Sequence, residues 1–376
     1  MLVPQRSIAR IPSDLSRPCL PAPLISTNTM TTHTSTSAFA DRRSAASLAY
    51  RLRGWTESRP YVTGFAVAAG VLAVSALANH RLAKRAEWRN PPSGRFIDVD
   101  GVRLHYIDRG EGPLLVLLHG NGTMIEDFAS SGLIDIAARR RRVIVFDRPG
   151  FGHSTRPRAK IWSAGAQAEL IHAALERIGV SRAVVLGHSW GASVAVELAL
   201  RHPQAVSGLV LASGYYFPSA RVDAVIISGP AVPVLGDVVR YTIAPIASRL
   251  AWPLLMRKIF GPAPVPAKFR RFPKEMAVRP SQIRAEAAES ALLIPTAAAA
   301  SGNYASLKMP VVIVAGAEDR LIDPAAQSHR LHRTIPQSTF RPVPGSGHMV
   351  HQTNTEAVMS AIEEVSARAD APHLST

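Results

Sequence analysis

A serine stands between two glycines in the stretch "VVLGHSWGASVAVELAL", residues 184–200. The β-branched apolar run before it predicts a short buried strand, and the residues after it carry apolar side chains at helical spacing. Ser189 therefore lies at a predicted strand-to-helix turn, where a strained backbone lifts the hydroxyl clear of the sheet. Such a turn leaves no room for side chains two positions away on either side, and those positions hold Gly187 and Gly191. An ordinary glycine-rich turn is the alternative, and the flanking strand and helix favour a nucleophilic serine.

A serine hydroxyl is a weak nucleophile at neutral pH, so it needs a base to take its proton and an acid to orient that base. The loop after a predicted strand at 311–315 carries three carboxylates. We predict Asp319 as the acid, because it lies just past the strand end, where catalytic residues of open parallel sheets gather. Asp323 precedes Pro324 and is typical of a helix N-cap, and Glu318 is the weaker substitute.

The base is expected on a later loop, in "STFRPVPGSGHMVH". An alternating segment at 338–343 predicts a strand, and the glycine-flanked loop after it carries His348. His351 is the rival in the same loop, but it lies toward a predicted helix and lacks the flanking glycine. We therefore predict that His348 takes the proton of the serine.

An oxyanion formed at the serine would need two backbone N–H donors. One is expected at Trp190, because a helix that begins there directs its positive end and free N–H groups beside the hydroxyl. The second is expected at Asn121 in "PLLVLLHGNGT", where a predicted buried strand ends in a glycine-rich turn. The supporting motif residues around these donors and the serine are His119, Gly120, Gly122, Gly187, His188 and Gly191.

Taken together, these motifs resemble the α/β-hydrolase superfamily over residues 93–368, with the chain order Ser189, Asp319, His348. The resemblance implies an α/β fold in which a mostly parallel eight-stranded sheet is flanked by helices and interrupted by a helical cap. It also implies that "FDRPGFGHS", residues 146–154, borders the entrance of the active site and shapes it without doing chemistry.

The resemblance also narrows the chemistry. Epoxide hydrolases and haloalkane dehalogenases of this superfamily carry an aspartate at the turn and form an alkyl ester, and Ser189 argues against both. We expect a serine hydrolase that cleaves an apolar carboxylic ester through an acyl-enzyme, without a cofactor or a metal. The same triad could serve perhydrolysis, C–C bond hydrolysis or acyl transfer to an alcohol. A binding protein without catalytic activity on this fold is the third possibility.

The chain is long enough for more than one domain, and predicted strands and helices alternate through most of it. Strands are expected at 95–100, 102–108, 114–118, 143–146, 183–187, 208–212, 311–315 and 338–343. Helices are expected at 164–178, 190–201, 324–334 and 355–367. The pair Asp100-Gly101 predicts a hairpin, so the sheet begins antiparallel and continues parallel. The predicted core comprises 93–215 and 307–368, with a tail at 369–376.

Between the two parts of the core, residues 216–306 show no strand pattern and are rich in Ala, Ile, Leu and Val. We assign them to the helical cap and expect an apolar substrate pocket beneath it. The segment "KFRRFPK" at 268–274 is basic, with Phe269 and Phe272 interleaved, which suggests a contact between the cap and a membrane.

The N-terminal quarter has a different composition. Residues 1–58 are rich in Ser, Thr, Ala, Pro and Arg and are predicted to be disordered. Residues 59–80 contain an uncharged stretch long enough to span a bilayer, and 81–92 form a predicted basic linker. We favour a single-pass anchor. A signal peptide cleaved after Ala76-Leu77-Ala78 is the alternative and would give a secreted or periplasmic protein.

Net charge is +16, and the first 95 residues hold 13 Lys and Arg but only 4 Asp and Glu. This excess beside an apolar stretch favours attraction to anionic membrane lipids over binding of nucleic acid. The basic residues on the two sides of the stretch balance, so the side of the membrane and the oligomeric state stay open. The single cysteine, Cys19, excludes an intramolecular disulfide.

Overall fold

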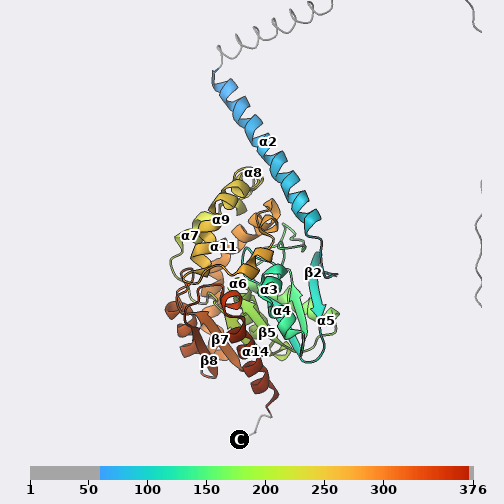
Figure 1. The fold of residues 1–376 in the computed structure, drawn as a ribbon, viewed down its shortest axis with the longest axis vertical. Helices are drawn as coiled ribbons and strands as arrows, with labels where there is room; N and C mark the ends of the chain where they lie inside the picture. The colour runs from blue at the N-terminus through green and yellow to red at the C-terminus, as the bar shows by residue number, and fades with distance from the viewer. Residues whose placement is uncertain (1–59, 372–376) are drawn as a thin grey trace, which may run out of the picture. The chain divides into compact units, whose positions relative to one another are not determined.

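The computed structural model describes residues 60–371, so the segment predicted to be disordered and the last five residues lie outside the described part. The chain divides into two units, Met1–Ala66 and Val67–Thr376, and the second unit contains the sheet, its flanking helices and the cap (Figure 1). The mostly parallel eight-stranded sheet flanked by helices is confirmed.

The strands form one sheet in the order β1-β2-β4-β3-β5-β6-β7-β8. The first two strands and the β2-β4 pair are antiparallel, and every later pair is parallel. Asp100 and Gly101 both adopt positive φ at the hairpin between β1 and β2, as an Asp-Gly turn requires. The strands are β1 (Arg95–Val99), β2 (Val102–Arg109), β3 (Leu114–Leu118), β4 (Arg142–Phe146), β5 (Ala183–His188), β6 (Val206–Ala212), β7 (Val311–Gly316) and β8 (Ser338–Val343).

Each central strand is apolar on both faces because helices cover both sides of the sheet. In β3, Val116 and Leu118 pack in a core with α5 (Ala164–Arg177) and α6 (Trp190–Arg201). Their neighbours Leu115 and Leu117 pack on the opposite face. The helices on that opposite face are α3 (Ile125–Ser131), α4 (Leu133–Ala137) and α14 (Thr355–Asp370). This double cover explains the continuous apolar runs in the strand sequences.

The segment between β6 and β7 is built from helices, the described residues there form no strand, and we keep the name cap for these helices. These helices lie together at one end of the second unit (Figure 1). They are α7 (Val222–Ile227), α8 (Leu235–Tyr241), α9 (Ala244–Phe260), α10 (Lys274–Ala277) and α11 (Pro280–Ala300), with short 3-10 turns between them.

The apolar N-terminal stretch forms helix α2 (Pro60–Arg89), which by length and composition can cross a membrane. The helix runs through most of the segment expected as a basic linker, because Ala86 packs in an apolar cluster with cap residues. Ser75 donates a hydrogen bond to the carbonyl of Thr242 (2.9 Å), and Asn79 Nδ2 donates to the same oxygen (2.9 Å). Within the second unit, α2 is therefore joined to the cap.

Candidate active site

Ser189 lies between β5 and α6 with a backbone conformation of φ 52° and ψ −118°, which non-glycine residues rarely adopt. The two flanking glycines are required by close approaches of the backbone. A Cβ at Gly187 would lie 2.2 Å from the carbonyl oxygen of Gly191, and a Cβ at Gly191 would lie 2.1 Å from that of Leu118. The structure therefore has the sharp strand-to-helix turn that places a serine side chain above the end of a sheet.

Asp319 and His348 form a buried pair at the ends of β7 and β8. The carboxylate oxygen Oδ2 of Asp319 lies 2.8 Å from Nδ1 of His348. The other oxygen, Oδ1, accepts hydrogen bonds from the amides of Leu321 (2.8 Å) and Ile322 (3.0 Å). Both carboxylate oxygens are thus held, and the imidazole is oriented through its Nδ1–H.

The alternative acids and bases lie elsewhere. Asp323 accepts a hydrogen bond from the amide of Ala325 (2.8 Å), as an N-cap residue does. His351 Nε2 lies 3.0 Å from Asp127, away from Asp319.

Among the described residues, the Ser189 hydroxyl makes no hydrogen bond. Catalytic serine–histidine hydrogen bonds often tighten only when a substrate binds.

His188 connects the serine turn to the histidine loop. Its Nε2 lies 3.0 Å from the main-chain oxygen of His348. Burial, followed by the nearby His351 and His348, lowers the pKa of His188 well below its ordinary value, so the ring is neutral. A neutral ring with its proton on Nε2 donates to that carbonyl and fixes the backbone of His348.

The glycine-rich turn after β3 lies against the serine, since a Cβ at Gly120 would be 3.2 Å from the Ser189 Cβ. The side chain of Asn121 donates through Nδ2 to the carbonyl of Glu286 and to the Ser290 hydroxyl, both at 3.1 Å. These bonds tie the turn to α11 of the cap. Trp190 is the first residue of α6, so its amide has no acceptor within the helix.

Arg148, which the sequence did not single out, forms hydrogen bonds with the glycine-rich turn after β3. Its guanidinium donates to the carbonyls of His119 and Gly120, each at 2.8 Å. The same group pairs with Glu289 of α11 at 2.5 and 3.0 Å, and both side chains are fully buried. Burial and the charge of Arg148 lower the pKa of His119 to about 3, so its neutral ring accepts from the Arg148 amide. One buried ion pair therefore links the turn to the cap.

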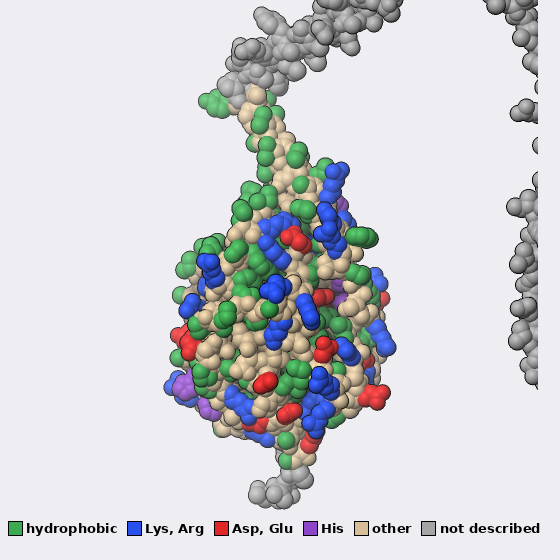
Figure 2. Space-filling view, viewed as in Figure 1, with side chains coloured by type: hydrophobic (Ala, Val, Ile, Leu, Met, Phe, Trp, Pro, Cys, Tyr) green, Lys and Arg blue, Asp and Glu red, His purple; other side chains and the backbone are tan. Residues whose placement is uncertain are grey.

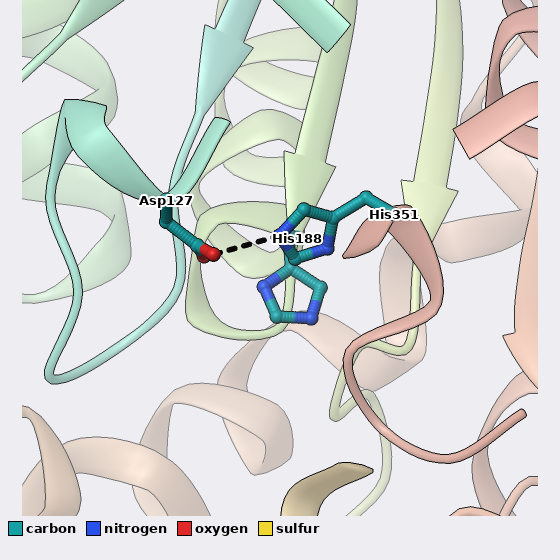
Figure 3. Close-up of side chains that lie close together, drawn as sticks. All are labelled: Asp127, His188 and His351. Carbon is teal, nitrogen blue, oxygen red and sulfur yellow. Dashed lines mark ion pairs between the residues drawn. The ribbon is translucent and has the colours of Figure 1, made fainter. Parts of the chain in front are cut away.

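A second buried cluster lies behind the histidine loop and comprises Asp127, His188 and His351 (Figure 3). Asp127 Oδ1 lies 3.0 Å from His351 Nε2, and Gln352 Nε2 lies 3.0 Å from the same oxygen. Burial raises the pKa of Asp127, but its interactions with His351 outweigh that effect and lower it to about 2. Of the described residues, these three hold ligand-type atoms within 4.8 Å of one another. The Asp127 carboxylate is thus held in the core by His351 and Gln352.

Glu286 of α11 adds a carboxyl group beside the glycine-rich turn after β3. A Cβ at Gly122 would lie 3.3 Å from that carboxyl group. Burial, and then the charge of Glu289, raises the pKa of Glu286 to about 7. The side chain is therefore neutral in weak acid and becomes charged as the pH passes neutrality.

This shift predicts a pH-dependent stability. Between about pH 4.5 and pH 7 the folded chain keeps the Glu286 proton and the unfolded chain loses it, so the free energy of unfolding falls as pH rises through this window. We expect Glu286→Gln to make that fall smaller, which urea unfolding at pH 5 and pH 8 would measure. Part of the slope should persist, because burial also raises the pKa of Glu126 to about 7. An unchanged slope in Glu286→Gln would contradict the prediction.

Comparison with known proteins agrees with this architecture. Residues 113–355 match the sequence model of the alpha/beta hydrolase fold family. Because the match covers more than half of the chain, the protein belongs to the alpha/beta hydrolase fold family, and its homologues are hydrolases.

The similar proteins include hydrolases of different chemistry. The chain is 24% identical over 292 residues to haloalkane dehalogenase 2 of Mycobacterium tuberculosis, covering 73% of this chain and 95% of that protein. It is 34% identical over 144 residues to 2-hydroxymuconate semialdehyde hydrolase of a Pseudomonas species, covering 37% of this chain and 51% of that protein. Among solved structures, a membrane phospholipase A, described as a bacterial virulence factor, has a TM-score of 0.59 at 24% identity. The structural match extends over 82% of this chain and 97% of the phospholipase chain.

Proposed function

We propose that the protein is a membrane-anchored serine hydrolase that cleaves an ester of an apolar carboxylic acid through an acyl-enzyme. The observation that carries this proposal is the strained turn at Ser189 together with the buried Asp319–His348 pair at the same end of the sheet. A serine in this turn needs an oriented imidazole to act as a nucleophile, and the pair supplies one. The fold of the membrane phospholipase A is consistent with an ester substrate.

In the proposed reaction, the Ser189 oxygen attacks the ester carbonyl while its proton moves to Nε2 of His348. The negative charge that develops on the carbonyl oxygen is stabilised by the amides of Asn121 and Trp190. His348 then gives the proton to the departing alcohol, which leaves an acyl-serine. Water attacks the acyl-serine by the same route and releases the acid. Asp319 keeps the His348 proton on Nδ1 throughout, so that Nε2 is free to accept.

Two alternatives differ in the bond that is cleaved. An alkyl-enzyme ester, as in dehalogenation, needs a carboxylate nucleophile, and this chain has Ser189 in that position. C–C bond hydrolysis uses a serine triad of this kind and is favoured by the similarity to 2-hydroxymuconate semialdehyde hydrolase. Product analysis with an apolar ester and with a vinylogous diketone would separate ester from C–C hydrolysis.

The anchoring part of the proposal is supported by α2, whose apolar window is not buried by the rest of the chain. A cleaved signal sequence passes the same test of length and composition. The N-terminal sequence of the mature protein would distinguish the two, since cleavage after Ala78 would leave Asn79 first.

A fluorophosphonate probe, which reacts with activated serines, tests the catalytic proposal. We expect the wild-type chain in membrane fractions to be labelled, and labelling to vanish in Ser189→Ala and His348→Ala. Ser193→Ala is the matched control, because this serine of α6 only donates to the Tyr215 carbonyl (3.3 Å) and should leave labelling intact. A folded wild-type chain that takes up no probe would overturn the proposal and favour a binding protein.

A further inference from the structure

A basic cavity of about 660 Å³ lies between α2 and the cap, and the catalytic proposal assigns it no role. Six cationic side chains line it: Arg85, Arg89, Arg249, Arg270, Arg271 and Lys274. One carboxylate accompanies them, since Glu275 pairs with Arg249 at 2.9 Å. The cavity therefore carries a large excess of positive charge.

Most of this charge is unpaired. Arg85 and Arg89 of α2 and Arg270 and Arg271 of the cap are exposed and form no ion pair with any described residue. Two arginines of α2 and two arginines of the cap thus line the same cavity without an acidic partner among the described residues. Bringing like charges together is unfavourable unless an anion joins them. The arrangement favours a ligand with at least one negative charge, and guanidinium groups are well suited to phosphate oxygens.

The wall of the cavity also has an apolar part, formed by Leu82, Ala86, Phe272 and Pro273. Phe269 and Phe272 stack at 5.0 Å and are both buried, so they do not reach outward toward a membrane as the sequence suggested. The basic residues of the same segment line the cavity instead. A ligand that matches both parts of the wall combines a phosphate with hydrocarbon, which favours a phospholipid over free phosphate.

The position of the cavity along α2 fits the headgroup layer of a bilayer. On the exposed surface of α2, Val71, Val74 and Leu77 are 63%, 70% and 52% exposed, and the first charge after them is Arg81. Arg85 follows about 6 Å further along the helix axis, at 1.5 Å per residue. Each headgroup layer is about 5–8 Å thick, from the difference between the full bilayer and its hydrocarbon core.

The cap also has exposed apolar side chains, with Leu250 and Leu254 of α9 76% and 67% exposed. In Figure 2, hydrophobic side chains lie along the helix and over the cap end of the second unit, with Lys and Arg side chains among them. Exposed apolar side chains bounded by basic ones are typical of a surface in contact with the membrane interface.

We infer that this cavity binds the headgroup phosphate of an anionic phospholipid, with Arg85, Arg89, Arg270 and Arg271 around the phosphate and Leu82 and Phe272 against the adjoining hydrocarbon. The inference rests on the proposed membrane anchoring but not on catalysis. A lipid bound here bridges α2 and the cap, so it holds the catalytic unit against the membrane surface.

Native mass spectrometry of the full-length chain, purified in detergent and incubated with phosphatidylglycerol or phosphatidylcholine, tests this site. Ser189→Ala is used as the background in every sample, so that bound lipid is not hydrolysed. We expect phosphatidylglycerol to be retained over phosphatidylcholine. The double variant Arg270→Glu/Arg271→Glu should retain at least about tenfold less phosphatidylglycerol, because each change replaces an attractive charge by a repulsive one beside the anionic headgroup. Arg139→Glu/Arg140→Glu makes the same charge change at exposed residues after α4 and should retain the lipid.

Three results would overturn the inference. Equal retention of the two lipids would show that the cavity does not select an anionic headgroup. Equal loss of phosphatidylglycerol in both double variants would show that net charge, and not the cavity, attracts the lipid. Displacement of the lipid by inorganic phosphate at equal concentration would show a phosphate site that does not use the apolar wall. Thermal unfolding of each variant checks that it is folded, and probe labelling of the wild type reports separately on the proposed function.

Discussion

The variant Asp319→Asn is expected to hydrolyse esters about 10⁴-fold more slowly than the wild type while keeping its fold, as in other serine triads. The two amides of Leu321 and Ile322 donate to Oδ1 of Asp319 and would hold the asparagine oxygen in the same place. The asparagine NH₂ group would then face His348 Nδ1, which could only accept. The proton of the imidazole would move to Nε2, where it blocks transfer from Ser189.

Asp323→Asn is the matched control for this experiment, because Asp323 lies in the same loop and only caps the following helical turn. We expect its kcat to stay within about twofold of the wild type, since the Asp323 carboxylate accepts only from the amides of Ala325 and Ala326 and an asparagine is nearly as good an N-cap residue. Steady-state kinetics with a short acyl ester measure both variants. An Asp319→Asn chain that retains a tenth of the activity, or a larger loss in Asp323→Asn, would show that the acid has been misassigned.

Glu289→Gln is expected to lower the free energy of unfolding by about 3–5 kcal/mol, the range for breaking a buried ion pair from one side. Its carboxylate is the counter-charge of the fully buried Arg148 and also lies 3.7 Å from Arg156. Without it, neither buried guanidinium group has an ion-pair partner among the described residues. Activity should fall too, because Arg148 holds the carbonyls of His119 and Gly120 in the turn that is proposed to supply the Asn121 amide.

Denaturant unfolding of wild type and variant measures this loss. Asp135→Asn removes a carboxylate of the same charge from the exposed pair with Arg109, whose side chains are 59% and 60% exposed. That control should cost at most about 1 kcal/mol, as surface ion pairs do. If the two variants lose the same stability, the buried pair has no special role in joining the cap to the core.

The sequence was sufficient to predict most of the core because the relevant signals are local. A β-branched run bounded by glycines predicts a buried strand, and the eight expected strands match the observed ones to within two residues at each end. The choice of Asp319 over Asp323 also used local information, namely the strand end and the proline that marks an N-cap. In the structure these two carboxylates do accept hydrogen bonds from different elements.

Other features could not be predicted because they depend on contacts between distant segments. Arg148 and Glu289 are 141 residues apart, and each resembles an ordinary surface residue in its local sequence. The pairing of Asp127 with His351 could not be predicted either, because it depends on the packing of α3 against α13 (Val350–Thr353). The basic segment after residue 80 was expected to be a linker from its charge. It is helical because one face, with Ala86, is covered by the cap.

The unbroken path of α2 through the Ser75 and Asn79 contacts has a geometric consequence for the catalytic unit. Under the proposed anchoring, a flexible tether would let the second unit tumble above the membrane, whereas a helix that is hydrogen-bonded to Thr242 restricts rotation of the cap about the helix axis. Each residue of an α-helix contributes about 100° of rotation and 1.5 Å of rise. Inserting one residue into α2 between Val67 and Ser75 would therefore rotate the apolar residues before the insertion by about 100° around the helix axis relative to the cap. The length of this helix, and not only its hydrophobicity, is under structural constraint.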